Sequence, residues 1–203
     1  SVDVLHARRT MALPLPATRL IVWFRNDLRL SDNYVVSRAA SLASRTKSVD
    51  VLPIYVFDPR TFAPSTWGSP KMGAHRARFQ LQSVLNLKHN LRAIGSDLLI
   101  AVGKPEEVIP KYLLDFPGST NVVLTQEEVT SEEHRVERKV KSAIRQPVPG
   151  GGGGKRLNNS LETLWGCTLY HKDDIPFAAD MGDLPDGFTP FKQKCEARTK
   201  PRE

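Results

Sequence analysis

Short apolar runs alternate with helix-like segments along most of this chain. The runs predict five strands, at 19–24, 49–57, 97–102, 121–124 and 160–165. The segments between them predict helices at 32–45, 76–94, 105–115 and 130–144. Strands that are joined through helices form parallel sheets with right-handed crossovers. We therefore expect an α/β fold, a Rossmann-like, doubly wound, five-stranded parallel sheet with helices on both faces.

Local residues predict where several of these elements begin and end. Ser31 or Asp32 can cap the first helix, and Gly95 favours the end of the second. The segment Thr130–Glu133 has the pattern of a capping box for the fourth helix. Pro53 lies inside the second strand, and it predicts an edge position or a bulge because proline cannot donate to a sheet ladder.

Composition narrows the classes of function. No apolar run approaches the roughly 20 residues that a membrane-spanning helix needs, so we expect no membrane segment. The net charge of +7 invites a polyanion such as nucleic acid, but the charges are spread out and no aromatic residues are interleaved with them. Cys167 and Cys195 lack metal-ligand spacing and indicate free thiols. No pattern predicts a catalytic or metal site.

The chain divides into three parts. We expect 1–18 to be a flexible tail, which fits either the remnant of an organelle transit segment or a plain disordered tail. The globular domain is predicted at 19–177, and 178–203 is expected to be the remnant of an interdomain connector or a further tail. The glycine-rich stretch 147–159 predicts a surface loop. Its GGGGGK run does not predict a phosphate-binding loop, because Arg156 stands where Ser or Thr would bind magnesium.

A ligand of such a sheet binds at the carboxyl ends of the strands, near a switch in strand order. The unusual residues of this chain follow the predicted strands, in the loops 25–29, 58–73, 103–106, 126–128 and 166–174. The GxGxxG pattern of dinucleotide-binding domains is absent. The loops therefore predict where a ligand binds, and not which ligand it is.

Four segments together resemble the photolyase/cryptochrome family, and in particular its cryptochrome-DASH branch with plant photolyase-like relatives. They are WFRNDLRLSDN at 23–33, LPIYVFDPR at 52–60, GKPEE at 103–107 and WGCTLYHKDD at 165–174. The resemblance covers about 19–196, interrupted by the glycine-rich loop, and Cys167 stands where a serine is usual.

The resemblance implies that the domain helps to hold an antenna pigment, methenyltetrahydrofolate or in some members a deazaflavin. It matches Glu128 to the family's folate-contacting glutamate, a role that suits a carboxylate because it accepts hydrogen bonds from the pterin's amide and amino groups. From the residues alone, Glu128 fits equally well as a charge that favours the positive end of the next helix. Asp27, Arg29 and Trp67 are weaker cofactor candidates; a charged loop network and loop packing also fit them.

In this family FAD, DNA binding and light-driven repair of pyrimidine dimers belong to a helical flavin-binding domain, which is the implied partner. No helical domain follows in this sequence, so we expect the chain not to act as a photolyase by itself. Two interpretations stay open: the antenna half of a longer blue-light flavoprotein, or a stand-alone α/β module for a nucleotide-like ligand or a protein partner. The resemblance favours a chloroplast or mitochondrion, and cytoplasm or nucleus stays open.

Overall fold

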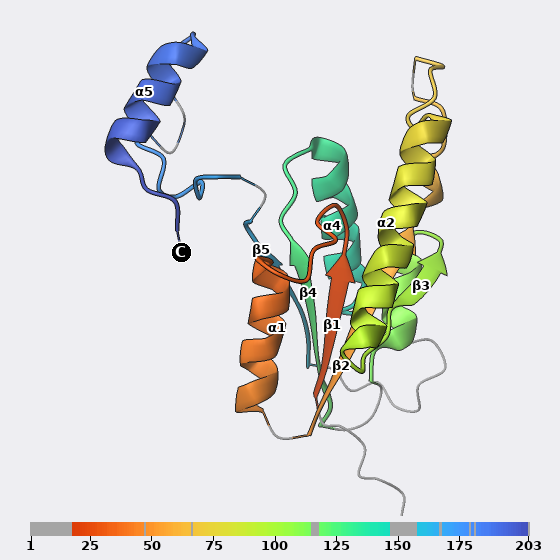
Figure 1. Ribbon diagram of the computed structural model, residues 1–203. Helices are drawn as coiled ribbons and strands as arrows, with labels where there is room; N and C mark the ends of the chain where they lie inside the picture. The colour runs from red at the N-terminus through yellow and green to blue at the C-terminus, as the bar shows by residue number, and fades with distance from the viewer. Residues whose placement is uncertain are drawn as a thin grey trace, which may run out of the picture.

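The computed structural model describes residues 18–46, 48–65, 67–114, 118–146, 158–166, 168–178, 180 and 182–202. Within these residues, five parallel strands form one sheet in the order β3-β2-β1-β4-β5 (Figure 1). The strands are β1 (Thr18–Phe24), β2 (Val49–Phe57), β3 (Leu99–Val102), β4 (Thr120–Gln126) and β5 (Asn158–Leu164). The predicted α/β fold is therefore confirmed.

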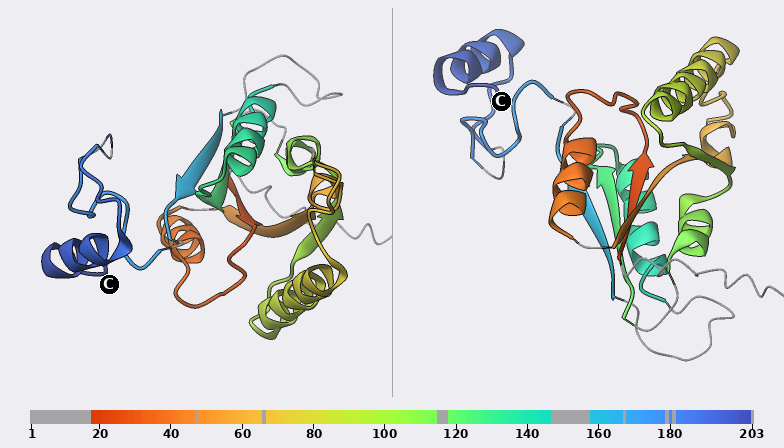
Figure 2. Two further views of the ribbon diagram at one scale, coloured as in Figure 1. Left: turned by 90° about the horizontal axis from the view of Figure 1, so that it is seen from above. Right: turned by 60° about the horizontal axis from the view of Figure 1, so that its bottom comes forward.

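Helices cover both faces of the sheet (Figure 2). The helical elements are α1 (Tyr34–Arg45), η1 (Pro59–Thr61), α2 (Ala74–Ala93), α3 (Pro105–Val108), η2 (Ile109–Tyr112), α4 (Ser131–Ala143) and α5 (Phe188–Arg198). One core layer packs the sheet against α1 and α2 through residues such as Val35 and Leu87. The other packs it against α3, η2 and α4 through residues such as Ile109 and Ile144. Alternate residues of β1 enter the two layers, because successive side chains of a strand point to opposite faces.

Two helix boundaries differ from the prediction. The first helix is capped by Asn33, whose side chain accepts hydrogen bonds from the Val35 and Val36 amides, and not by Ser31 or Asp32. The third helix is α-helical only over Pro105–Val108 and continues as the 3-10 turn η2. Pro110 accounts for the change, because proline has no amide hydrogen to donate within a helix. The capping box at Thr130 and Glu133 is confirmed, with both reciprocal bonds present.

Pro53 occupies a special place in β2. The strand has neighbours on both sides, so it is not an edge strand as a whole. Its pairing with β3 begins at Ile54, one residue after the proline, while Pro53 itself lies opposite Val22 of β1. The missing amide hydrogen therefore costs no ladder bond to β3. The predicted edge position is correct locally, although the strand is an inner one.

Asn121 links the start of β4 to the preceding loop and to β5 by side-chain hydrogen bonds. The side chain is fully buried, and its amide donates to the Leu114 carbonyl at 3.0 Å and to Asn159 of β5 at 2.7 Å. Its oxygen accepts from the Leu114 amide at 2.7 Å. Asn121→Ala is expected to lower the free energy of unfolding by about 2–3 kcal/mol, because buried groups lose their partners. Urea denaturation measures the change, and Asn90→Ala on the exposed face of α2 is the control, with an expected change within about 0.5 kcal/mol.

The segment after β5 leaves the sheet and ends in α5, which stands apart from the globular body (Figures 1 and 2). Phe177 stacks on Phe191 of the helix with ring centroids 5.3 Å apart. Arg202 pairs with Asp174, and the Thr199 hydroxyl donates to the Asp174 carbonyl. Cys195 is a buried free thiol in α5, whereas Cys167 lies outside the described residues.

Candidate functional site

The switch in strand order lies between β1 and β4. The chain runs from β1 outward to β2 and β3, and then returns to place β4 on the other side of β1. The loops that follow β1 and β4 lead to helices on opposite faces of the sheet, and such a switch point is where ligands of open α/β sheets bind. Arg25 and Asn26 follow β1, and Glu127 and Glu128 follow β4. The loops that the sequence singled out therefore meet at one end of the sheet.

Side chains of α4 reach back to the first loop. Arg25 and Glu137 form an ion pair at 2.5 Å, and their side chains are only 10% and 9% exposed. The Arg25 guanidinium also lies 4.9 Å from the ring centroid of Trp23. Asn26 donates to Glu133 at 2.9 Å, and the capping box holds Glu133 in place. A fixed charged network therefore ties the loop after β1 to α4.

Glu128 is the exceptional carboxylate of this network. Its side chain is buried, and its Oε1 atom has no hydrogen-bond partner among the residues that the structure describes. Burial raises the pKa of Glu128 above its ordinary value; the Asn26 side chain and the Arg25 charge oppose the shift, and two nearby glutamates add to it. The backbone amide of Glu128 donates to Glu137 at 3.3 Å, which fixes the start of this loop. A buried carboxylate with a free acceptor is suited to a ligand that brings hydrogen-bond donors.

A cavity of about 420 Å³ opens beside this network, between the ends of β1 and β2. Its aromatic lining consists of Trp23, Phe24, Tyr55 and Phe57, and Tyr55 meets Phe57 edge-on. Gln80 of α2 donates to the Tyr55 hydroxyl at 2.6 Å, and within the described part of the chain its own Oε1 is buried without a hydrogen-bond partner. Burial raises the pKa of the Tyr55 hydroxyl. The cavity therefore combines flat apolar walls with an unused acceptor.

Ion pairs frame the mouth of this cavity. Arg60 binds Asp58 at 2.6 Å and Glu106 at 2.8 Å, which ties the end of β2 to the start of α3. The hydrogen bonds that Arg60 donates to Asp58 and Glu106 raise its pKa above the ordinary value, against the opposing effect of burial. Lys71, from the loop before α2, reaches Glu132 of α4 at 2.8 Å. All of these residues except Glu106 line the cavity, and their ion pairs join the elements around it.

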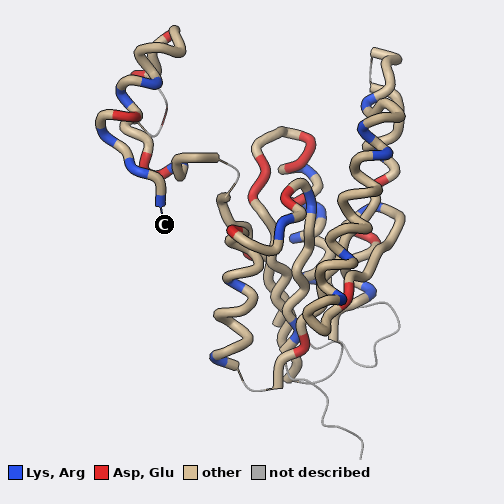
Figure 3. The backbone as a smooth tube through the Cα atoms, in the orientation of Figure 1, with Lys and Arg blue, Asp and Glu red and all other residues tan. Residues whose placement is uncertain are grey.

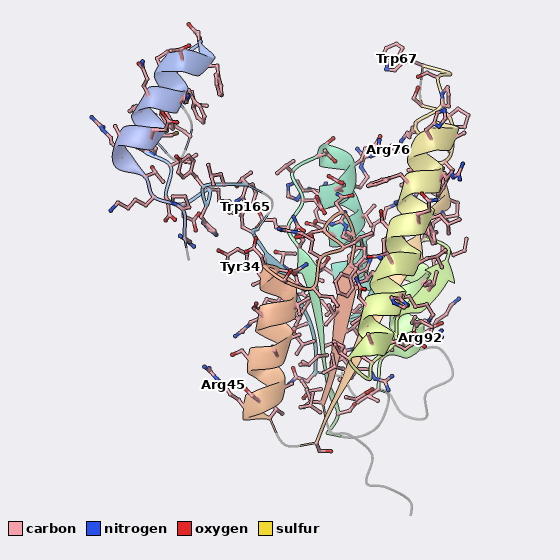
Figure 4. All side chains as sticks on the ribbon, viewed as in Figure 1. Tyr34, Arg45, Trp67, Arg76, Arg92 and Trp165 are labelled. Atoms are coloured by element: carbon pink, nitrogen blue, oxygen red, sulfur yellow. The ribbon has the colours of Figure 1, made fainter. Side chains whose placement is uncertain are left out.

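The structure does not gather all of the predicted site residues. Glu128 lies at the switch point, but it does not line the 420 Å³ cavity. Asp27 and Arg29 form a surface network with Asp32, with Arg29 at 2.9 Å from Asp27 and 3.1 Å from Asp32. Trp67 lies in the loop that precedes α2, and its side chain is 92% exposed (Figure 4). The roles of these four residues as cofactor contacts remain predictions.

Three further residues were not predicted from the sequence. The sequence identified Glu133 only as a residue that caps a helix. It contains no motif that marks Glu137 or Gln80 as site residues. On a helix, glutamate and glutamine at these positions are typical of a solvated face. Their burial depends on partners distant in sequence, Arg25 for Glu137 and Tyr55 for Gln80. Only the tertiary structure reveals them.

Residues 20–203 match the DNA photolyase family, and the chain therefore belongs to that family. The match extends from β1 through the whole described domain. The family assignment agrees with the resemblance in the loop sequences.

Within this family the chain is similar to cryptochrome DASH proteins. It is 47% identical over 188 residues to a chloroplastic/mitochondrial cryptochrome DASH of Ostreococcus tauri, with 92% of this chain and 34% of the relative covered. A chloroplastic/mitochondrial cryptochrome DASH of rice, Oryza sativa subsp. japonica, is 43% identical over 188 residues, covering 90% of this chain and 31% of the relative. The chain thus spans about a third of the length of these relatives.

Solved structures support the same assignment. The cryptochrome of Synechocystis sp. PCC6803 superposes with a TM-score of 0.77 at 33% identity, and covers 94% of this chain and 36% of its own. The archaeal photolyase of Sulfolobus tokodaii, solved with two FAD molecules, has a TM-score of 0.65 at 22% identity, covering 91% of this chain and 36% of its own. The second comparison supports the fold alone.

Two further findings concern the described residues only. Among them, no helix is both long and apolar enough to cross a bilayer. No group of three or more His, Cys, Asp or Glu side chains in the same part of the chain is placed to hold a metal ion.

Proposed function

We propose that this domain binds the antenna pigment of a cryptochrome-DASH-type blue-light flavoprotein, and that the pigment is methenyltetrahydrofolate. The observation that carries the proposal is Glu128, a buried carboxylate with an unpartnered oxygen at the switch point. The amide N–H and the amino group of a pterin are two adjacent donors, and a carboxylate accepts both. When bound, such a pigment absorbs light and passes the excitation to a flavin.

The chain's own residues prepare this contact. Arg25 holds Glu137, Glu137 accepts the backbone amide of Glu128, and the loop after β4 is thereby fixed before a ligand arrives. A preorganised acceptor loses little conformational freedom on binding. The N–H groups of a bound pterin then donate to the Oε1 atom of Glu128, which the described residues of the domain leave without a donor.

Titration of the chain with methenyltetrahydrofolate tests the proposal. Binding is expected to raise the fluorescence anisotropy of the pigment, because the bound pigment tumbles with the protein. Folic acid and an unrelated heterocycle such as tryptophan serve as ligand controls. Unchanged anisotropy up to millimolar protein would contradict folate binding by this domain alone.

The strand-end cavity supports a second candidate, a nucleotide-like ligand bound by a stand-alone module. A volume of about 420 Å³ falls in the range of small-molecule sites, and the aromatic walls suit a planar ring. The unpartnered Oε1 of Gln80 offers an acceptor for a ring N–H group. Flavin mononucleotide is a suitable probe because it carries both a planar ring and a phosphate.

Gln80→Leu separates the two candidates. The substitution removes the free acceptor of the cavity, and it is expected to weaken flavin mononucleotide binding about tenfold while leaving folate binding unchanged. Quenching of tryptophan fluorescence reports the flavin, because Trp23 lines the cavity. Leu85→Gln, on the exposed side of the same helix, is the control. Loss of folate binding in Gln80→Leu would instead place the pterin in the cavity.

The relatives also contain sequence that this chain does not span. The relatives are about three times as long as this chain, which is consistent with a further domain in a complete protein. We propose that the further domain is a helical FAD-binding domain, that DNA reaches the flavin through it, and that any photolyase activity requires it. The chloroplastic/mitochondrial relatives support an organelle as the compartment.

A further inference from the structure

The outward face of α4 is a band of cations. Val140 and Ile144 point into the core, and the opposite side of the helix is exposed. Five exposed cations occupy that side and the turn that closes the helix: Arg135, Arg138, Lys139, Lys141 and Arg145. We call these five residues the α4 ridge. Exposed side chains interspersed with them are polar and neutral, Ser142 and Gln146 among them, and no large apolar residue is exposed on this helix.

The acidic residues of α4 do not neutralise the ridge. Glu132 pairs with Lys71, and Glu137 pairs with Arg25 on the inner side. Glu133 is occupied by Asn26 and by the capping box. Within the part of the chain that the structure describes, only Lys139 of the ridge has a carboxylate within 4.0 Å, that of Glu106 at 3.7 Å. The other four cations face solvent without an acidic partner there.

Helix stability does not account for this arrangement. Cations three and four residues apart on a helix repel one another, as Arg135 and Arg138 do, or Arg138 and Lys141. The ridge lies on the α3/α4 face of the sheet, whereas the cavity lies at the carboxyl ends of the strands. Apart from Arg135 and Lys139, the ridge does not line the cavity. A polyanion that binds along the helix would remove the repulsion.

We propose that the α4 ridge binds the phosphodiester backbone of nucleic acid without sequence preference. Arginine is suited to phosphate because its guanidinium donates two parallel hydrogen bonds. Ser142 and Gln146 add neutral donors of the kind that contact phosphate and sugar. The ridge carries no aromatic residue for base stacking, so the backbone rather than the bases is the target. It also lacks the apolar residues that anchor an amphipathic helix in a lipid surface.

The test measures binding of a short fluorescein-labelled duplex DNA of mixed sequence to the 203-residue chain, by anisotropy at several salt concentrations. The triple variant Arg138→Gln, Lys141→Gln, Arg145→Gln leaves the cavity lining intact. It is expected to weaken binding by roughly tenfold or more, and to reduce the slope of log K against log salt by about 3, because each lost phosphate contact removes about 0.9. An unchanged circular dichroism spectrum shows that the variant is folded.

A matched variant separates the ridge from net charge. Arg45, Arg76 and Arg78 are exposed cations on α1 and α2, and among the described residues no carboxylate lies within 4.0 Å of them. Figure 4 shows Arg45 and Arg76 on these two helices, and Figure 3 shows further Lys and Arg residues along α2. Their triple glutamine variant changes the charge equally and is expected to retain most of the binding. Equal losses in both variants would overturn the proposal, as would absent duplex binding in the parent chain.

Competition experiments distinguish nucleic acid from other polyanions. Unlabelled RNA and DNA duplexes are both expected to displace the probe, since each presents a phosphodiester backbone. Poly-glutamate and vesicles with anionic phospholipid are expected to displace it poorly. Displacement by either of these as effective as by nucleic acid would overturn the assignment and indicate an acidic protein or a membrane surface as the partner.

Discussion

Glu128→Gln is expected to weaken binding of methenyltetrahydrofolate about 10- to 100-fold and, at the same time, to stabilise the empty domain. The loss of affinity follows from charged hydrogen bonds, which are worth about 1.5–3 kcal/mol, with tenfold in affinity for each 1.4 kcal/mol. The gain in stability follows from removal of a buried charge that lacks a partner on Oε1. A gain of about 1 kcal/mol corresponds to roughly 2–4 °C in Tm for a chain of this size.

The predicted loss of folate affinity together with a gain in stability is specific to a binding residue. A carboxylate that served only the fold would lose stability when replaced, whereas a preformed acceptor loses affinity and gains stability. Glu127→Gln is the matched control, because it makes the same change one residue away, at a side chain that pairs with Lys172 on the surface. Equal effects of the two substitutions on folate affinity would exclude a particular role of Glu128.

The pH dependence gives a further check on the same residue. Burial raises the pKa of Glu128 in the folded state above its unfolded value, so the folded carboxyl holds its proton to higher pH. Its ionisation therefore opposes folding at neutral pH, and this penalty disappears as the pH falls through the folded-state pKa. Folate affinity is expected to decrease over the same interval, because the protonated carboxyl accepts fewer hydrogen bonds. Glu128→Gln is expected to show neither dependence.

Arg25→Met is expected to lower the free energy of unfolding by about 3–5 kcal/mol, since it leaves Glu137 buried without its partner. The same substitution is expected to reduce folate affinity, because Glu137 holds the loop of Glu128. Denaturant unfolding followed by circular dichroism measures the stability, and the folate titration measures the second effect.

A double-mutant cycle tests the cause. Adding Glu137→Leu to Arg25→Met removes the uncompensated charge, and the double variant is expected to recover most of the lost stability. Arg29→Met is the control, because its guanidinium pairs with Asp27 and Asp32 at the surface, and only a small change is expected there. Additive losses in the double variant would show that Arg25 acts through contacts other than Glu137.

The sheet was predictable because its signals are local. Each strand is an apolar run, and parallel pairing follows from the helices between the runs. The capping box at Thr130 was also correct, because both partners lie within one turn. The third helix was predicted too long, although Pro110 marks the change to η2 in the sequence itself.

The site was predictable only in part, because its contacts are not local. The loops at the strand ends were identified correctly, and the resemblance singled out Glu128. Glu137 escaped prediction because its partner Arg25 is 112 residues away, so its burial has no counterpart in the pattern of α4. Asn33 escaped for a different reason: Ser31, Asp32 and Asn33 are all capable caps, and only the backbone geometry selects among them.

The pairing of β1 with β4 has a consequence for the order in which the protein is made. Thr18 lies opposite Thr120, so 102 further residues must be synthesised before the second neighbour of β1 begins. Until then β1 pairs only with β2, which β3 joins on its other side, and one edge of β1 stays open. Contacts this distant slow folding, because a long loop must close before they form. At about 5–20 residues per second, the ribosome holds that edge exposed for several seconds. We therefore expect any chaperone that protects the chain during synthesis to act first at β1, the strand that becomes the centre of the sheet.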